Sequence, residues 1–431
     1  MADETPDYVN DVPGRHCTDT PAPRCGHVYG HDGFHRGVPV KGKRCGYPVT
    51  HGVGPYCIFH RVQTPDDAPV REELELAQRE EAYLAELRIC KRDLSGLQLP
   101  APSIPNSAFN GVSLKGADLR GGDLTGCAFG VFYWHDEHIC DLGEAQLQSS
   151  DLSRSSLVRA HLTDAYMVST KLSDTDLTRA VMRRCNLQGA TIEGRSVLRN
   201  ADLTDALLRD CRIGREVDLE GVVWRQDERP WWVRIAGEQE PVFRDERELR
   251  NWPPRYGKPR EEWFRTISGC ERTYRQIKRC YQDSGQYEQA GQFFIREMEC
   301  KRKQSTGLRR AAFWLMRVLS DYFESPGKVV GIALGMVLVF AYLHGCLGLC
   351  ECAGPHVSVA PQWPGAVSWE GIEYFVTTCV YFSMVTFTTL GHGDIHSANG
   401  WGRMACSVEA ATGAIMLALF LVCLARKYGR A

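Results

Sequence analysis

The sequence predicts a multi-domain chain, in which a solenoid of five-residue repeats precedes an α-helical domain that crosses a membrane twice. The first part rests on an apolar residue that recurs at every fifth position over most of Leu94–Ile213. The second rests on two long apolar runs near the C-terminus, Val329–Leu349 and Trp401–Leu424. Cysteines and histidines that cluster in the first 60 residues predict, in addition, a small N-terminal metal-bound module.

These patterns divide the chain into consecutive segments. They are a flexible N-terminus (1–24), a zinc-knuckle-like module (25–62), an amphipathic or capping helix (66–93), the repeat solenoid (94–221), a cap or linker (222–257), a helical hairpin with a linker helix (258–325) and the membrane domain (326–431).

Composition limits the classes of function. The chain has 431 residues, a formal net charge of -2 and a sequence pI near 6.7, so nothing indicates a nucleic-acid binder in bulk. Met1–Asp11 is acidic and polar and lacks the apolar segment of a secretory signal. We therefore expect the N-terminal part to stay in the cytoplasm.

The N-terminal cluster has the ligand types of a structural zinc site. Cys25 and Cys45 each precede a glycine, and Cys57 and His60 have the one-turn spacing that places both on one side of a short helix. Four sulfur and nitrogen ligands suit tetrahedral zinc. The segment resembles a treble-clef zinc knuckle with these four residues as ligands, which leaves no open position for chemistry. The alternative is a set of reduced thiols without metal.

Residues 66–93 predict a helix, because they are rich in helix formers and their leucines recur near helical spacing. From Leu94 the apolar period changes to five. In most repeats a small residue stands two positions before the apolar one, and Cys127, Cys185 and Cys211 occupy such positions. We expect these thiols to be small buried groups.

The five-residue pattern resembles the pentapeptide-repeat family. The resemblance implies a right-handed quadrilateral β-helix, with four units per coil and the apolar and small residues stacked inside. Each coil buries its face only against its neighbours. The pattern specifies the fold, and it is weak evidence for function.

An insertion at Gly130–Glu144 interrupts the repeats, and the register is expected to resume at Leu147. Its His135, Asp136 and His138 are residue types that bind metals. The alternative is an aromatic loop that packs on a cap or on a neighbouring subunit. Acidic and basic residues nearly balance over the repeats, which argues against the acidic surface of a DNA mimic.

The connecting region predicts a cap followed by two helices. Residues 222–257 hold several tryptophans and prolines, consistent with a short β cap. Glu261–Cys280 and Tyr287–Lys303 read as helices, and the spacing around their turn resembles one hairpin of tetratricopeptide type. A single hairpin cannot bury its own face, so we expect it to dock on the solenoid cap or on another subunit. It would link the solenoid to the membrane domain.

The two apolar runs predict membrane spans with both chain ends in the cytoplasm. Val329–Leu349 is long enough for a hydrocarbon core of about 30 Å at about 1.5 Å per residue. Lysines and arginines precede the first run and follow the second, whereas none occurs over 329–401. By the positive-inside rule, the central loop lies outside.

Between the spans, Trp369–Thr386 predicts an apolar helix that is too short to cross the bilayer twice. It leads into the string Thr-Phe-Thr-Thr-Leu-Gly-His-Gly-Asp. This string resembles the pore loop of the two-helix potassium channel family, apart from His392, where tyrosine or phenylalanine is usual. The resemblance implies that four copies meet on one axis and that their carbonyl oxygens replace the hydration shell of K⁺. It assigns the selectivity filter to Thr388, Thr389, Leu390, Gly391, His392, Gly393 and Asp394.

The resemblance continues on both sides of the filter. Tyr381 and Phe382 match the aromatic positions that support it, and Tyr381 can hydrogen-bond Asp394. The Trp-Gly-Arg string that ends at Arg403 has the family's spacing. Gly413 lies in the middle of the second span, where a gating bend would form.

Two ionisable side chains carry open alternatives. His392 either packs behind the filter, as tyrosine does, or gains charge in external acid and weakens conduction. Glu409 lies inside the second span, where an ionisable residue is a functional hypothesis. Its alternative is a protonated or hydrogen-bonded carboxyl packed between helices.

The sequence therefore predicts a homotetrameric potassium channel of the plasma or inner membrane, inward-rectifier-like or ligand-gated. Potassium is the transported ion, zinc the structural one, and the cytoplasmic domain has an unknown protein or small-molecule regulator. One rival is a nonselective cation channel. Another is a membrane-anchored interaction scaffold whose pore is only an effector. No nucleophile–base pair or open metal site supports an enzyme, and no nucleic-acid partner is expected.

Overall fold

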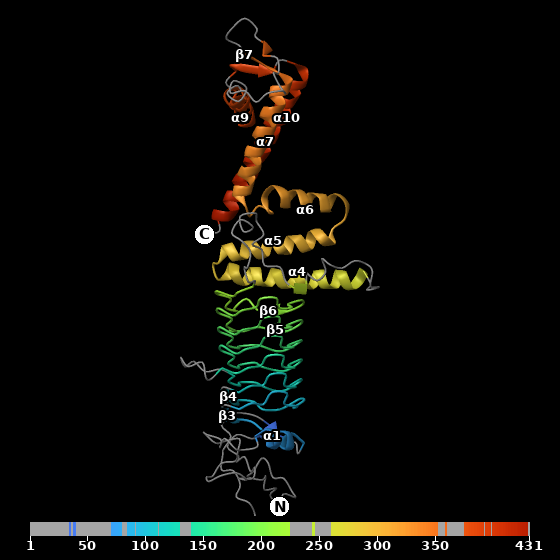
Figure 1. Ribbon diagram of the computed structural model, residues 1–431, viewed down its shortest axis with the longest axis vertical. Helices are drawn as coiled ribbons and strands as arrows, with labels where there is room; N and C mark the ends of the chain where they lie inside the picture. The colour runs from blue at the N-terminus through green and yellow to red at the C-terminus, as the bar shows by residue number, and fades with distance from the viewer. Residues whose placement is uncertain are drawn as a thin grey trace, which may run out of the picture. The chain divides into compact units, whose positions relative to one another are not determined.

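The computed structural model divides the chain into two compact units, Met1–Gln304 and Ser305–Ala431 (Figure 1). Its described residues are 34–35, 38–39, 70–79, 84–90, 92–110, 112–129, 139–224, 244–245, 260–351, 358–359, 375–391, 393–397 and 399–429. Within the N-terminal segment, β1 (Phe34–His35) and β2 (Val38–Pro39) pair in antiparallel fashion.

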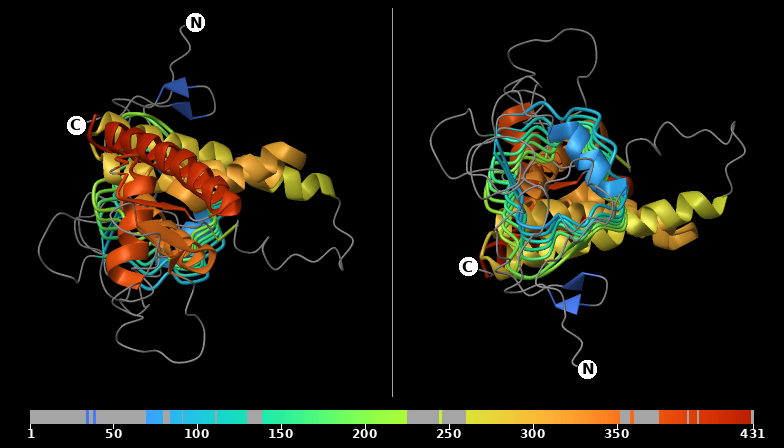
Figure 2. Two further views of the ribbon diagram at one scale, coloured as in Figure 1. Left: turned by 90° about the horizontal axis from the view of Figure 1, so that it is seen from above. Right: turned by 90° about the horizontal axis from the view of Figure 1, so that it is seen from below.

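Most of the described part of the first unit is a solenoid whose coils are joined by parallel backbone bridges (Figures 1 and 2). Asp93 bridges Ser113, 20 residues further on, and this spacing recurs along the solenoid. The longer parallel pairs are β3 (Arg88–Cys90) with β4 (Ala108–Asn110) and β5 (Thr191–Ile192) with β6 (Arg212–Ile213). A pentapeptide-repeat solenoid is therefore confirmed. Its right-handed, quadrilateral form stays a prediction.

The core of the solenoid lies inside the coils. The repeating leucines are fully buried, as at Leu152 and Leu162, and so are the small residues between them, such as Ala160. Each unit turns through one residue with positive φ, for example Arg154 at 60° and Arg159 at 61°. Such a conformation is strained for a residue with a side chain. Backbone bonds to the next coil, including Arg154 N to Ser173 O at 2.8 Å, stabilise it.

The cysteines within the repeats are buried and chemically quiet, as predicted. Cys127, Cys185 and Cys211 are at most 1 % exposed. Burial raises the pKa of the Cys127 and Cys211 thiols to about 12. A thiol with such a pKa is almost entirely protonated at neutral pH and is a poor nucleophile.

The predicted helix over 66–93 is wrong in its second half. Helix α1 spans Val70–Arg79, and from Leu84 the chain already follows the solenoid. Leu84 and Ile89 are buried and extend the five-residue register backward from Leu94. Stacking on the next coil therefore overrides the helix propensity of this segment. Helix α1 covers the end of the solenoid, because its buried side chains join the same core.

The predicted extent of the insertion is also wrong. Asp141 bridges both Ser113 and His161, and Leu142 is buried, so the repeat resumes before Leu147. The chain needs only one buried apolar residue and one bridge to rejoin the stack, and Leu142 supplies the first. The central part of the insertion, 130–138, lies outside the described residues.

The predicted hairpin docks on the last coils of the solenoid. Most of the predicted β cap, 225–243 and 246–257, lies outside the described residues. The hairpin consists of α4 (Arg260–Asp283) and α5 (Tyr287–Gln304). The hydroxyl of Thr273 donates to Leu208 O at 2.9 Å, and Trp224 Nε1 donates to the Tyr281 hydroxyl at 2.9 Å. Helix α4 therefore covers backbone groups that a further coil would otherwise pair.

The second unit contains the two predicted spans. Helix α6 (Gly307–Ser320) leads through a turn into α7 (Pro326–Leu347), and α10 (Gly400–Tyr428) follows near the C-terminus. Among the described residues, α7 and α10 are the helices that are long and apolar enough to cross a membrane. They pack on each other through a cluster that includes Val329, Met416 and Cys423.

Short elements occupy the region between the spans. The π-helix η3 (Phe375–Val380) continues directly into α9 (Tyr381–Phe387). A three-stranded antiparallel sheet joins β7 (Leu349–Glu351), which follows α7, to β8 (Ser358–Val359) and β9 (Ile395–Ser397).

Candidate functional site

The candidate site is the loop 388–394, which lies between α9 and β9. Helix formation over 375–387 overlaps the predicted helix, whose first residues, 369–374, lie outside the described ones. At the end of α9, the Thr388 hydroxyl donates to Met384 O at 2.7 Å and closes the last turn. The loop therefore begins at the C-terminal end of a helix, where the helix dipole favours a cation.

Three described residues of the loop have a left-handed backbone. Thr389, Gly391 and Gly393 have φ values of 59°, 60° and 76°, whereas Leu390 between the first two does not have a positive φ. Where right- and left-handed residues alternate, the N–H groups of successive peptides turn to one side, so their carbonyl oxygens turn to the other. Glycine adopts this conformation without strain, so the two glycines of the string fit their places. His392 lies outside the described residues.

The predicted bond between Tyr381 and Asp394 is confirmed. The Tyr381 hydroxyl donates to Asp394 Oδ2 at 2.9 Å, and the backbone N–H of Ile395 donates to Asp394 Oδ1 at 3.1 Å. Strand β9 then pairs with β7, with Leu349 opposite Ser397. Both ends of the loop are thus attached to helices: one end continues α9, and the other returns to the end of α7.

The Trp-Gly-Arg string has a structural reason here. Asn399 caps α10, because its Oδ1 accepts from Gly402 N at 2.8 Å, and its Nδ2 donates to Leu347 O at 2.7 Å. A Cβ at Gly402 would lie 1.7 Å from Ser397 Oγ. A larger residue at this position would require the Ser397 hydroxyl to rotate away where α10 starts beside β9.

Gly413 lies at a close contact between α10 and the end of α9. A Cβ on this residue would lie 1.9 Å from Phe387 O, the last carbonyl of α9. Helix α10 runs without interruption through this position. The predicted role of Gly413 as a gating hinge stays a prediction, and close packing is a second reason for glycine at this point.

Two functional candidates were not predicted from the sequence, His344 of α7 and Ser383 of α9. Both contact Glu409 of α10, and all three side chains are 0 % exposed. Phe382, the second predicted filter-support residue, is buried and packs edge-on against the His344 ring at 5.0 Å. The signal for His344 was its presence as an ionisable group within an otherwise apolar span. Ser383 had no sequence signal.

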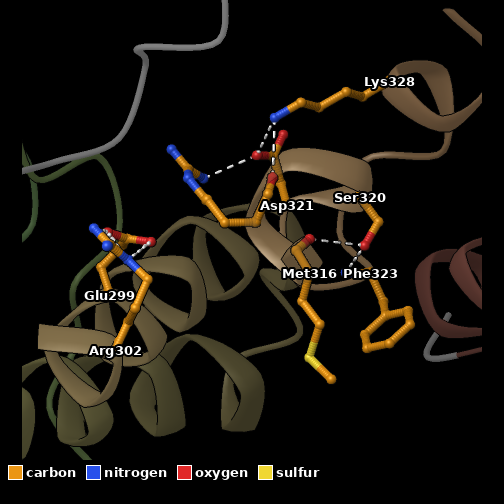
Figure 3. A network of polar contacts seen from close by, with 8 residues as sticks. Glu299, Arg302, Met316, Ser320, Asp321, Phe323 and Lys328 are labelled. Atoms are coloured by element: carbon orange, nitrogen blue, oxygen red, sulfur yellow. Dashed lines mark hydrogen bonds and ion pairs between the residues drawn. The ribbon is translucent and has the colours of Figure 1, made fainter. Parts of the chain in front are cut away.

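An ion-pair network lies at the turn between α6 and α7, at the end of α7 away from His344 (Figure 3). In the turn after α6, Asp321 Oδ1 accepts from Lys328 Nζ at 2.8 Å and from Arg317 Nη1 at 3.0 Å. Glu324 pairs with Arg426 Nε of α10 at 3.2 Å. Side chains of three helices therefore meet at the α6–α7 turn, so a displacement of α6 acts on the ends of both spans.

The predicted metal sites are outside the region that the structure describes. Among the described residues, no group of three or more His, Cys, Asp or Glu side chains could hold a metal ion. The zinc site and the insertion site therefore stay predictions, and the residues concerned are Cys25, Cys45, Cys57 and His60 for the first and His135, Asp136 and His138 for the second.

Comparisons with known proteins place these two regions in families. The family described as "Ion channel" matches residues 332–430, which include α10, the loop and most of α7. The family described as "Pentapeptide repeats (8 copies)" matches residues 140–179 and 169–194 of the solenoid. These matches define a membrane protein of the ion-channel class. More particularly, the chain is a pentapeptide-repeat protein fused to a two-helix ion-channel domain.

Solved structures similar to this chain include pentapeptide-repeat proteins and a fluoroquinolone resistance protein. A trypsin-treated form of the plasmid-mediated fluoroquinolone resistance protein QnrB1 is 18% identical, with a TM-score of 0.19 over 32% of this chain and 90% of its own. A pentapeptide repeat protein of the Arabidopsis thaliana thylakoid lumen is 22% identical, with a TM-score of 0.18 over 28% and 70%. HetL of the cyanobacterium Nostoc sp. is 19% identical, with a TM-score of 0.13 over 33% and 84%. No curated protein matches the chain.

Proposed function

We propose that four copies of this chain form a potassium-selective channel in the cell membrane. The observation that carries the proposal is the loop backbone, which is left-handed at Thr389, Gly391 and Gly393 and directly follows the C-terminal end of a helix. In the proposed channel, carbonyl oxygens of this loop would face the ion and replace the hydration shell of K⁺.

Exposure of the loop in a single chain supports an oligomer. Leu390 is 69% exposed, and the neighbouring described residues of the loop are exposed as well. Irregular backbone is tolerated at membrane depth only where protein covers it or where it lines a water-filled cavity. Further copies of the chain would supply that cover, and four copies on one axis suit the ion.

Reversal potentials in planar bilayers test the selectivity. Replacing external K⁺ by Na⁺ should shift the reversal potential of the full-length channel toward the K⁺ equilibrium value. Gly391→Ala should abolish the current, because φ at this residue is 60°. Gly335→Ala is the matched control, since nothing lies within 4 Å of a Cβ there. Equal permeability to Na⁺ and K⁺ would favour the nonselective rival, and current that survives Gly391→Ala would refute the filter assignment.

The proposed role of His392 has its own test. If the imidazole packs behind the filter as tyrosine does, wild type and His392→Tyr share one dependence of current on external pH. If external acid charges the ring, wild-type current falls near the usual histidine pKa of about 6.5 and the variant's does not.

The cytoplasmic domain is proposed to regulate or assemble the pore, with both chain ends in the cytoplasm. Support comes from the α6–α7 turn, where Asp321 and Glu324 bind basic groups of α7 and α10 respectively. A pull on α6, transmitted from a protein or small-molecule regulator of the solenoid, would therefore reach both spans. Deletion of residues 1–250 should change open probability. Unchanged gating would favour a role in assembly, or the scaffold rival.

The N-terminal module is proposed to bind one structural zinc ion per chain through Cys25, Cys45, Cys57 and His60. Metal analysis of the purified full-length protein should give one zinc per chain. A variant with Cys25 and Cys45 replaced by serine should give none, and an unchanged zinc content would refute this ligand set.

A further inference from the structure

Three polar side chains meet in the interior of the channel unit, each from a different helix. His344 Nε2 lies 2.9 Å from Glu409 Oε2, and the Ser383 hydroxyl contacts Glu409 Oε1. Ser383 Oγ also lies 2.8 Å from Val337 O of α7. His344, Ser383 and Glu409 are all 0 % exposed, and His344 Nδ1 has no hydrogen-bond partner among the residues that the structure describes. An arrangement of this kind is costly unless every donor is used.

Counting donors leaves one satisfactory assignment. Val337 O is a carbonyl and can only accept, so the single hydroxyl proton of Ser383 goes to it. Glu409 Oε1 must then be the donor in its short contact with Ser383 Oγ, which requires a protonated carboxyl. Glu409 Oε2 is the carbonyl oxygen and accepts from His344 Nε2–H. The unpartnered Nδ1 of His344 is then a lone pair rather than a buried N–H.

The competing assignment is an ion pair of protonated His344 with ionised Glu409. It leaves Nδ1–H as a buried donor without an acceptor, and it places two charges where the exposed fraction is zero. Ser383 has one proton for two acceptors in that case. Such a pair has a desolvation cost that its attraction repays only with good geometry and further hydrogen bonds. The neutral chain has neither defect.

We propose that Glu409 is a neutral carboxylic acid that positions α9, the helix that leads into the loop 388–394. The directed chain runs from His344 through Glu409 and Ser383 to Val337 O, and it joins α7, α9 and α10 at one buried point. Ser383 lies on the helix that ends at the filter, so the chain fixes where the filter begins. The inference deepens the proposed function but rests only on the ion-channel domain, and it holds for any permeant ion.

Apart from His344, no titratable group among the described residues supplies a counter-charge for an ionised Glu409. On α10 the nearest basic residue is Arg403, which is exposed and about 9 Å away along the helix axis. The thiols of Cys379 of η3 and Cys406 of α10 belong to the apolar cluster that contains Phe382, which packs against His344. Lys328 belongs to the opposite end of α7, where it binds Asp321. A protonated Glu409 needs no charged partner.

Substitutions at Glu409 in the full-length channel test the proposal. The amide of Glu409→Gln can accept from His344 and donate to Ser383, so it reproduces the chain. We expect this variant to keep ion flux and the melting temperature of the oligomer close to wild type. Glu409→Leu removes both bonds and should reduce flux about tenfold or more, as expected for the loss of buried hydrogen-bond partners. Ser407→Ala is the control, because that exposed hydroxyl bonds only Arg403 O of its own helix, at 3.1 Å.

Infrared spectroscopy supplies a readout that does not depend on conduction. At neutral pH, the wild-type protein should show the C=O stretching band of a protonated carboxylic acid, and Glu409→Gln should lack it. An absent band, together with Glu409→Gln behaving like Glu409→Leu, would establish the ion pair and overturn the proposal. Wild-type flux and melting in Glu409→Leu would overturn the positioning role. If the wild-type channel conducts Na⁺ as well as K⁺, that result counts against the proposed potassium selectivity and leaves this inference intact.

Discussion

Replacing Gly413 by alanine separates two explanations of this glycine, a gating hinge and a close contact. An added Cβ would lie 1.9 Å from Phe387 O, where contacts under 3.0 Å essentially never occur. Either α10 or the end of α9 must therefore move by about 1 Å, and such overpacking typically costs about 1–3 kcal/mol. Because α9 leads into the loop 388–394, the proposed selectivity filter, we expect Gly413→Ala to lower both the melting temperature of the oligomer and its conductance.

The assay compares melting of the detergent-solubilised oligomer with single-channel conductance in bilayers. The control is Gly331→Ala on α7, where a Cβ meets nothing within 4 Å. There, alanine should raise helix stability slightly, by up to about 1 kcal/mol. Because the clash at Gly413 involves a backbone oxygen, truncation of the Phe387 side chain in a double variant should not rescue it.

A hinge alone gives a different result. Alanine would then stiffen α10 and change open probability, while the melting temperature and the conductance of each open channel stayed at wild-type values. That outcome for Gly413→Ala would refute the close contact as the reason for the glycine.

Three further predictions follow from the contacts. Burial alone would raise the pKa of Glu297, but hydrogen bonds from Lys278 and two other basic groups lower it from 4.5 to about 2. Ionised Glu297 therefore stabilises the hairpin fully above pH 4.5, and this stabilisation is lost as the pH falls toward 2. The free energy of unfolding should fall less over this pH range in Glu297→Gln than in wild type. Thr273→Val removes the hydrogen bond from α4 to Leu208 O. The free energy needed to detach the hairpin from the solenoid should fall by about 1 kcal/mol, which faster proteolysis of the hairpin would show, and ion selectivity should not change. Tyr381→Phe removes the bond to Asp394 and should shorten channel openings without blocking conduction; unchanged gating would show that this bond does not stabilise the loop.

The order of domains could be read from the sequence because each depends on a local, repeated pattern. Apart from the insertion after Phe129 and one extra residue after Ile192, a period of five runs from Leu94 to Ile213, and only stacked coils bury every fifth residue. Two apolar runs of membrane length are equally unambiguous, and α7 and α10 are found where they were predicted. The Tyr381–Asp394 bond was also predicted, since a short motif at fixed spacing brings these residues together.

Boundaries and long-range partners needed the tertiary structure. Leu84 is three residues from Leu87, which is a helical spacing, and five from Ile89, so only the neighbouring coil decides between the two periods. His344 and Ser383 are 65 and 26 residues from Glu409, so no local pattern connects these residues with that carboxyl. The sequence determined that an ionisable group lies within a span. Which atoms surround it was decided by the packing of three helices, because hydrogen bonds depend on positions that separation along the chain does not fix.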